Sequence, residues 1–262
     1  MLSYQHIYHA GNLADVHKHF ILCELLNLLT GKDRPISYME THAGRGLYNL
    51  RSPESEKTGE AEQGIIALRK KKILPENSLY IKILDDVEKK EGKDFYPGSP
   101  LVAKLILRKK DQIHLMEKHP QEIKFLRRNL EGENVSVHFR DGYEGVLALS
   151  PPKPPEPRRG LVFIDPSYEV KTEYSDVANF VSKLSKKWPE ATIVIWYPIL
   201  KQGYHKDLIQ DIKKQKFENV IVDEYVFSKN KNDEGMLGSG MAIINAPFGI
   251  DSAIKNIRRI LI

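Results

Sequence analysis

The sequence has 262 residues, and 41% of them are hydrophobic, which is enough for one large domain with a full core. The net charge of +5 fits a nucleic-acid partner, but a solvated surface of mixed charge has the same balance. Cys23 is the one cysteine, which excludes a disulfide framework and a zinc site built from cysteines. The first residues do not resemble a signal peptide and no apolar run is long enough to cross a membrane. We therefore expect a cytoplasmic protein without a membrane partner.

The first expected helix starts after Asn12, a residue that caps helix N-termini well. Apolar residues then recur at helical spacing from Val16 to Leu26, and Gly31 lies where the helix should end. Residues 36–40 form the first expected strand, which leads directly into a turn of small residues at 41–46. The glycines of this turn allow the backbone to approach a ligand closely.

Six further strand patterns follow, and helical patterns such as the one from Val177 to Trp188 separate them. The alternation predicts an α/β fold with a mostly parallel, Rossmann-like sheet. Seven strands are the number in a methyltransferase-type doubly wound sheet. The six later strands are expected at residues 113–117, 135–139, 161–165, 192–196, 220–225 and 241–245.

One connection between strands is too long. A nucleotide-binding unit places the acidic end of its second strand roughly 20 residues after the glycine turn. Here Glu117 follows Gly46 by 117 − 46 = 71 positions. We therefore expect residues 52–96 to form an inserted helical subdomain over the mouth of the active site, and residues 1–51 and 97–262 to form the main domain. Binding of substrate and a purely structural role both remain open for the insertion.

The motif Asp165-Pro166-Ser167-Tyr168 stands at the carboxyl end of an apolar strand, where open α/β sheets bind their ligands. An adenine amine is a poor nucleophile because its lone pair is delocalised into the ring. The Asp165 carboxylate and the Pro166 carbonyl can accept its two N–H groups and direct the lone pair at a methyl donor. Tyr168 offers a ring face on which the base can stack. A turn capped by aspartate is the alternative interpretation of the same residues.

Polar residues also follow other expected strands. Glu117 stands where a carboxylate normally binds ribose hydroxyls, and Asp141-Gly142 stands where an aspartate can meet the adenine amine of a cofactor. We expect Ser99 to cap a helix whose free N–H groups hold the carboxylate of the cofactor. Each residue also fits an ordinary turn or helix start, but their common register favours a pocket for S-adenosylmethionine.

Histidines are frequent near the start of the chain. Since His17 and His19 project from different faces of the expected helix and no His-Glu-x-x-His motif is present, we expect no metal site. Lys18 and His19 are better suited to contact a cofactor carboxylate or an RNA phosphate.

Eight longer motifs, spread from residue 1 to about residue 248, carry a resemblance to a known family. Through them the chain resembles the RlmJ family of bacterial 23S ribosomal RNA adenine-N6 methyltransferases. The motifs are Met1-Leu2-Ser3-Tyr4, His9-Ala10-Gly11-Asn12, Ala14-Asp15-Val16, Lys18-His19, Thr41-His42-Ala43-Gly44, Thr58-Gly59-Glu60, Tyr96-Pro97-Gly98-Ser99-Pro100 and Gly238-Ser239-Gly240-Met241.

The resemblance implies a class I methyltransferase fold and methylation of N6 of adenine 2030 in 23S ribosomal RNA. It implies that Asp165 is catalytic, with Pro166 and Tyr168 beside it, and that Tyr4, Lys18 and Tyr168 contact the substrate. We expect the RNA to be modified before the ribosome is fully assembled, by a monomeric enzyme. The residues implied in binding S-adenosylmethionine are His19, His42, Ser99, Glu117, Asp141, Gly142 and Asp165.

Ser167 departs from the Asp-Pro-Pro-Tyr motif that amino-methyltransferases of this type usually carry, and it lacks the fixed φ of the second proline. We expect the change to be tolerated. Two alternatives stay open: methylation of DNA adenine, because the amine chemistry is the same, and a non-catalytic nucleic-acid-binding protein linked to the use of external DNA. The intact Asp165, Tyr168, Glu117 and Asp141 argue against lost catalysis.

Overall fold

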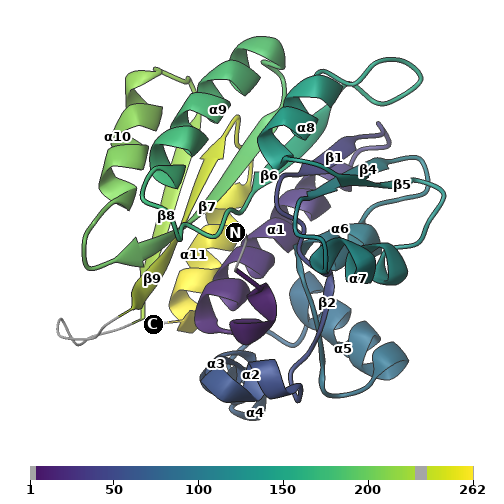
Figure 1. Ribbon diagram of the computed structural model, residues 1–262, viewed down its shortest axis with the longest axis vertical. Coiled ribbons are helices and arrows are strands. Elements are labelled where there is room, and N and C mark those ends of the chain that lie inside the picture. The colour runs from purple at the N-terminus through teal and green to yellow at the C-terminus, as the bar shows by residue number, and fades with distance from the viewer. Residues whose placement is uncertain (1–3, 228–234, 262) are drawn as a thin grey trace.

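A seven-stranded sheet forms the centre of the molecule, as the sequence predicts (Figure 1). The computed structural model describes residues 4–227 and 235–261, so Met1-Leu2-Ser3 of the first motif lies outside the described part. The strands of the sheet are β1 (Ser37–Glu40), β4 (Gln112–Glu117), β5 (Val135–Phe139), β6 (Gly160–Ile164), β7 (Thr192–Leu200), β8 (Val220–Val226) and β9 (Met236–Ile244). Their order is β5-β4-β1-β6-β7-β9-β8, and neighbouring strands are parallel except where β9 pairs with β7 and β8.

Helices cover both faces of the sheet, because its central strands are apolar on both sides. In β6, for example, all residues from Leu161 to Ile164 are fully buried. The covering helices are α1 (Leu13–Thr30), α6 (Ser99–Ile106), α7 (Glu122–Asn129), α8 (Gly142–Leu149), α9 (Glu173–Lys187), α10 (His205–Lys214) and α11 (Ile250–Leu261). Helices α8, α9 and α10 lie on one face, and α1, α6 and α11 lie on the other (Figure 1). Among the described residues, no helix has the length and apolar character needed to span a membrane.

The predicted ends of α1 are confirmed, and the predicted start of α6 is wrong. The Asn12 side chain accepts a hydrogen bond from the Asp15 backbone N–H at 2.8 Å, and α1 ends at Gly31. In α6 the N-cap is Gly98, and Ser99 is already helical. Ser99 does not cap the helix because its hydroxyl donates to the buried Glu40 carboxylate at the end of β1.

The long connection after β1 contains a two-stranded antiparallel ribbon and four short helices. Gly64 separates the second of these helices from the third. The buried Tyr80, Ile83 and Leu84 belong to the same hydrophobic core as the rest of the chain. The boundary of a separate subdomain at 52–96 therefore stays a prediction. The elements are β2 (Leu47–Asn49), α2 (Pro53–Thr58), α3 (Glu60–Gln63), α4 (Ile65–Lys70), α5 (Leu79–Glu91) and β3 (Phe95–Pro97).

The inserted helices pack against the segment that precedes α1, which contains the 3-10 turn η1 (His6–Tyr8). The Ile65 N–H donates to the Gly11 carbonyl at 2.8 Å, and the Thr58 hydroxyl donates to the Tyr8 carbonyl. A Cβ on Gly64 would lie 2.1 Å from the Gly11 oxygen, so the two backbones touch at this point. The insertion thus fixes the segment on which the first histidines lie.

The strand order determines where a ligand can bind. From β1 the sheet extends through β4 and β5 on one side and through β6 and β7 on the other. The carboxyl ends of these five parallel strands meet at one edge, and a crevice forms where the order reverses.

Candidate active site

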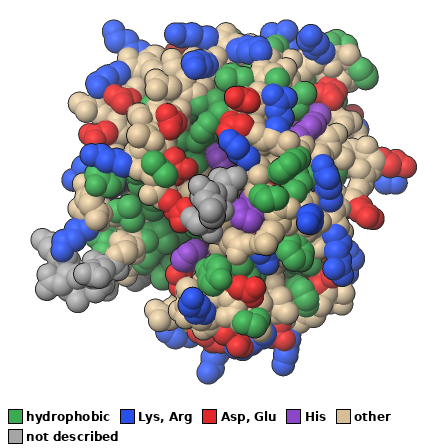
Figure 2. Space-filling model, viewed as in Figure 1, with side chains coloured by type: hydrophobic (Ala, Val, Ile, Leu, Met, Phe, Trp, Pro, Cys, Tyr) green, Lys and Arg blue, Asp and Glu red, His purple; other side chains and the backbone are tan. Residues whose placement is uncertain are grey.

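A cavity of about 1240 Å³ opens at the carboxyl ends of the parallel strands. Small-molecule sites usually enclose about 300–1,000 Å³, so this cavity has room for a cofactor and part of a second ligand. In Figure 2, His, Asp and Glu side chains lie together near the middle of this face, and Lys and Arg side chains gather toward its edges. Every site residue expected from the sequence lines the cavity: Tyr4, Lys18, His19, His42, Ser99, Glu117, Asp141, Gly142, Asp165, Pro166 and Tyr168.

On one side of the cavity, the turn after β1 is tied to the end of β4. The Gly44 N–H donates to one Glu117 carboxylate oxygen at 2.7 Å, and the His119 N–H donates to the other at 2.6 Å. Gly44 has φ +60°, a left-handed conformation that favours glycine. Burial raises the pKa of Glu117 above its usual value. The carboxylate is thereby held at the cavity wall.

The next wall is the start of α8. Asp141 caps this helix by accepting hydrogen bonds from the backbone N–H groups of Tyr143 and Glu144. A Cβ on Gly142 would lie 2.0 Å from the Thr41 carbonyl, so this close approach to the turn after β1 requires glycine. The Tyr143 hydroxyl is buried and has no hydrogen-bond partner among the described residues. An unpartnered donor in the cavity wall indicates that a polar ligand completes this region.

Behind the cavity, burial determines the charge of three side chains. It lowers the pKa of His19 to about 3 and the pKa of His42 to about 4, so both imidazoles are neutral. His19 Nδ1 lies 2.8 Å from the Tyr96 hydroxyl. Burial also raises the pKa of Glu40 to about 8, although the hydroxyls of Ser99 and Tyr38 both donate to its carboxylate. The sequence alone did not identify Glu40 as a residue of the site.

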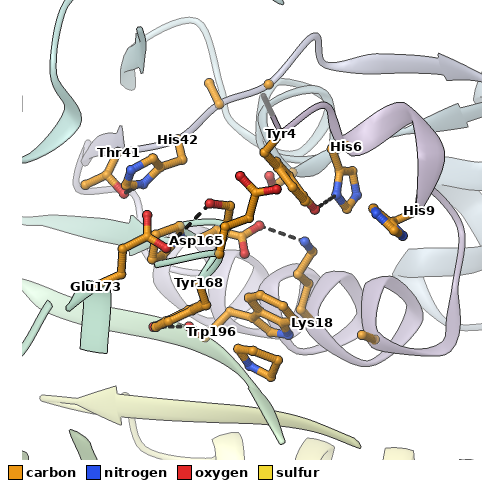
Figure 3. A pocket seen from close by; sticks show the side chains of 18 of the residues that line it. Tyr4, His6, His9, Lys18, Thr41, His42, Asp165, Tyr168, Glu173 and Trp196 are labelled. Atoms are coloured by element: carbon orange, nitrogen blue, oxygen red, sulfur yellow. Dashed lines mark hydrogen bonds and ion pairs between the residues drawn. The ribbon is translucent and has the colours of Figure 1, made fainter. Parts of the chain in front are cut away.

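On the other side of the cavity, Asp165 directly follows β6 and contacts a buried cation. Lys18 Nζ lies 2.7 Å from Asp165 Oδ2 (Figure 3). It also lies 2.9 Å from Asp15 Oδ1. Lys18 is 3% exposed, yet the two carboxylates keep its pKa above the usual value. Sequence reasoning expected Lys18 to contact a ligand. In the structure its ammonium orients the Asp165 carboxylate.

The ion pair continues outward to the start of the chain. His6 Nε2 lies 2.9 Å from Asp15 Oδ2, and the Tyr4 hydroxyl lies 2.9 Å from His6 Nδ1 (Figure 3). Burial alone would raise the pKa of Asp15, but His6 and Lys18 hold it well below its usual range. Asp15 and His6 are functional candidates that the sequence did not reveal. The sequence did carry one signal for this ion pair: Asp15 and Lys18 are three residues apart, so they lie on one helix face.

Tyr168 occupies an uncommon backbone conformation with φ +54°. Its hydroxyl donates to the Trp196 carbonyl at 2.8 Å, and its ring centroid lies 4.5 Å from that of Tyr174. The ring is 6% exposed, so stacking of a base on it stays a prediction. The Ser167 hydroxyl lies 3.5 Å from a Glu173 oxygen, where the usual proline would have no such group.

His17 and His19 leave α1 on different sides and bind protein groups. His17 contacts Ser239 and Asp223, whereas His19 contacts Tyr96. Within residues 4–227 and 235–261, no group of three or more His, Cys, Asp or Glu side chains is arranged to hold a metal ion.

The family model for the ribosomal RNA large subunit methyltransferase RlmJ matches residues 33–262. The chain belongs to the RlmJ family. It is 35% identical to ribosomal RNA large subunit methyltransferase J of Escherichia coli over 98% of this chain and 91% of that protein. It is 38% identical to the protein of the same name from Haemophilus influenzae, over 98% of this chain and 92% of that one. The family resemblance expected from the motifs is confirmed.

Solved structures agree with the fold. A crystal structure of a Legionella pneumophila protein superposes with a TM-score of 0.85 at 35% identity, over 96% of this chain and 92% of that one. The METTL16 methyltransferase domain, at 8% identity, has a TM-score of 0.50 over 88% of this chain and 68% of that one, and it supports the fold alone. The class I methyltransferase fold expected from the strand count is confirmed.

As a member of this family, the chain is a methyltransferase that uses S-adenosylmethionine. The cavity residues fit that cofactor. Carboxylates stand at the ends of β4 and β5, Gly44 and Gly142 line the cavity at two close-packed turns, and the Tyr143 hydroxyl lacks a hydrogen-bond partner among the described residues. The cavity volume leaves space for a base beside it.

Proposed function

We propose that this methyltransferase methylates the exocyclic N6 amine of an adenine in 23S ribosomal RNA, at adenine 2030 by family resemblance. The names of both curated relatives, large subunit methyltransferases, support an RNA of the large ribosomal subunit. The Asp165-Pro166-Ser167-Tyr168 turn in the cavity supports an amine as the acceptor.

The position of Asp165 carries the proposal. Lys18 Nζ donates a hydrogen bond to Asp165 Oδ2, so Asp165 Oδ1 remains to accept one N–H of the adenine amine. The Pro166 carbonyl accepts the other N–H, and together they direct the nitrogen lone pair toward the cofactor side of the cavity. Bound S-adenosylmethionine supplies the methyl group. Asp165 then takes the proton that the methylated amine releases. The rest of the enzyme's contribution is positioning and exclusion of water.

In the same proposal, each of the remaining cavity residues binds either the cofactor or the substrate. Glu117 binds ribose hydroxyls and Asp141, with Gly142, meets the adenine of the cofactor. His19, His42 and Ser99 face its methionine end. Tyr4 and Tyr168 contact the target base, which enters unstacked from the RNA.

Asp165→Asn tests the proposal because it keeps the shape of the side chain and removes the carboxylate. We expect methyl transfer to a 23S RNA transcript to fall by at least about 100-fold, as for loss of a catalytic acid or base. Calorimetry should show S-adenosylmethionine still binding. Asp176→Asn is the matched control, since Asp176 lines the same cavity on α9 without contacting Asp165, and it should keep most activity. Wild-type rates in Asp165→Asn would disprove the role of Asp165.

One alternative is decided by the same assay. Methyl incorporation into duplex DNA in preference to stripped ribosomal RNA would make the chain a DNA adenine methyltransferase. Membership of a methyltransferase family argues against the other alternative, a non-catalytic nucleic-acid-binding protein linked to the use of external DNA. We also propose that the enzyme acts as a cytoplasmic monomer before ribosome assembly is complete, which size-exclusion chromatography and assays on naked 23S RNA would test.

A further inference from the structure

A row of polar side chains beneath the amine side of the cavity takes no part in the chemistry described so far. Ser239 Oγ lies 2.9 Å from Trp196 Nε1 and 2.9 Å from His17 Nδ1. His17 Nε2 lies 2.8 Å from Asp223 Oδ2, and Arg258 Nε donates to Asp223 Oδ1. These residues come from β7, β9, α1, β8 and α11, so the row crosses one end of the sheet from the cavity to the last helix.

The direction of most hydrogen bonds in the row can be assigned. An indole N–H can only donate, so Ser239 Oγ accepts from Trp196. The Asp223 carboxylate can only accept, so His17 Nε2 donates to it, and Ser239 Oγ also lies within hydrogen-bond distance of His17 Nδ1. Ser239, His17 and Asp223 are all fully buried. Removal of one member therefore leaves its neighbours without partners in a place that water does not reach.

At its cavity end the row reaches Trp196, which contacts Lys18, the ion-pair partner of Asp165. Trp196 lines the cavity, and its ring centroid lies 5.0 Å from Lys18 Nζ (Figure 3). The Trp196 carbonyl also accepts the hydrogen bond of Tyr168. His17 and Lys18 are consecutive in α1: His17 fixes the helix to β8 and β9, while Lys18 reaches Asp165 at the end of β6.

We propose that Ser239, His17 and Asp223 are positioning residues for methyl transfer. They fix the position of the Trp196 indole and the rotation of α1 about its axis. The indole and the helix in turn hold the Lys18 ammonium against Asp165. This inference rests on the proposed role of Asp165. A structural role alone would change the free energy of unfolding but not the kcat of the folded enzyme.

The chain has two tryptophans, which makes the test direct. Trp188 is buried, donates to the Arg158 carbonyl and packs at Gly160, at the opposite end of β6 from the cavity. Trp188→Phe therefore leaves Trp196 as the one fluorescent indole and also serves as the control for loss of a buried N–H donor. We expect this parent to methylate 23S RNA with wild-type kcat.

Ser239→Ala in that parent should shift the emission of Trp196 and lower kcat about tenfold, since small misplacements of reacting groups are costly. The KM for S-adenosylmethionine should not change. In the wild-type background, Trp196→Phe with Ser239→Ala should lose less activity than the two single effects combined, because the hydrogen bond that they share is lost only once.

Two results for Ser239→Ala would overturn the inference. One is a shifted Trp196 emission with an unchanged kcat, and the other is an unchanged Trp196 emission. If Ser239→Ala does not fold, Asp223→Asn in the same parent replaces it, with the same expected drop in kcat and the same outcomes against it. A wild-type enzyme that fails to methylate adenine in 23S RNA would refute the proposed function instead, before any variant is compared.

Discussion

Lys18 is a buried cation between two carboxylates, and its neighbours show why it tolerates burial. A lone ammonium in the core would lose its proton, but Asp15 and Asp165 each lie within 3 Å of it. His6, together with Lys18, keeps the pKa of Asp15 low despite its burial. Removal of one charged side chain from a buried ion pair lowers the stability of the fold more than removal of both, because the remaining buried charge is left uncompensated.

Lys18→Met retains the aliphatic length of the side chain and removes its charge. We expect the free energy of unfolding to fall by about 3–5 kcal/mol and methyl transfer to be lost, because two carboxylates then face each other without a cation. Urea unfolding and transfer of labelled methyl groups would measure the two effects. Asp15→Asn combined with Lys18→Met should recover part of the stability and none of the activity. A single variant as stable as wild type would contradict this account of the ion pair.

Glu40 makes stability depend on pH. Its pKa is about 8 in the folded protein against 4.5 as the ordinary value, so between these pH values the folded state binds a proton that the unfolded chain releases. Stability from this group is complete below about pH 4.5 and is lost as the pH rises to 8. Glu40→Gln cannot titrate. Its stability relative to wild type should therefore increase from pH 5 to pH 8, by about 1.4 kcal/mol per unit at most. A difference between the two proteins that is independent of pH would rule this out.

Among the elements, the strands and α1 were predictable because their apolar periodicity is a local property of the sequence. β2 and β3 were not, since three residues are too few to show alternation. The start of α6 was misplaced by one residue, because the Ser99 hydroxyl binds Glu40 instead of its own helix. Strand ends placed Glu117, Asp141 and Asp165 in the cavity. The i,i+3 spacing of Asp15 and Lys18 was a local signal, but the contact between Trp196 and Ser239 could not be predicted, because it depends on how two strands pair.

The contact between α4 and the segment before α1 is close enough to test with one methyl group. Gly64→Ala would place a Cβ 2.1 Å from the Gly11 oxygen, so the insertion must shift away from the segment that carries His6 and His9. We expect a loss of stability of about 1–3 kcal/mol and a lower methylation rate. Gly31→Ala is the control, because its Cβ would meet the nearest atoms at 3.4 Å and its φ is −59°. Equal melting temperatures for the two variants would show that the contact is unimportant.

At the scale of the whole molecule, the insertion and the main sheet share one core. Tyr80 of α5 bonds to the Tyr96 hydroxyl, which in turn contacts His19 at the cavity. The ring of Tyr80 also packs against Phe20 of α1. The insertion therefore supports the active site through α1 as well as through the preceding segment.

Replacement of residues 51–93 by a short turn between β2 and β3 tests how far this support extends. We expect the shortened protein to lose its cooperative thermal transition, because the apolar faces of α1 and of the ribbon become exposed. Circular dichroism during heating would measure the transition. A shortened protein that melts like wild type and still binds S-adenosylmethionine would show that the main domain folds without residues 51–93.

The first and last helices of the chain are neighbours. Helix α11 packs on α1 (Figure 1). Arg258 of α11 donates to Asp223, which in turn binds His17 of α1. Helix α1 ends at Thr30 and α11 begins at Ile250, so α1 is synthesised long before the helix on which it packs. We therefore expect a refolding chain to fix the rotation of α1 late, only once α11 has docked.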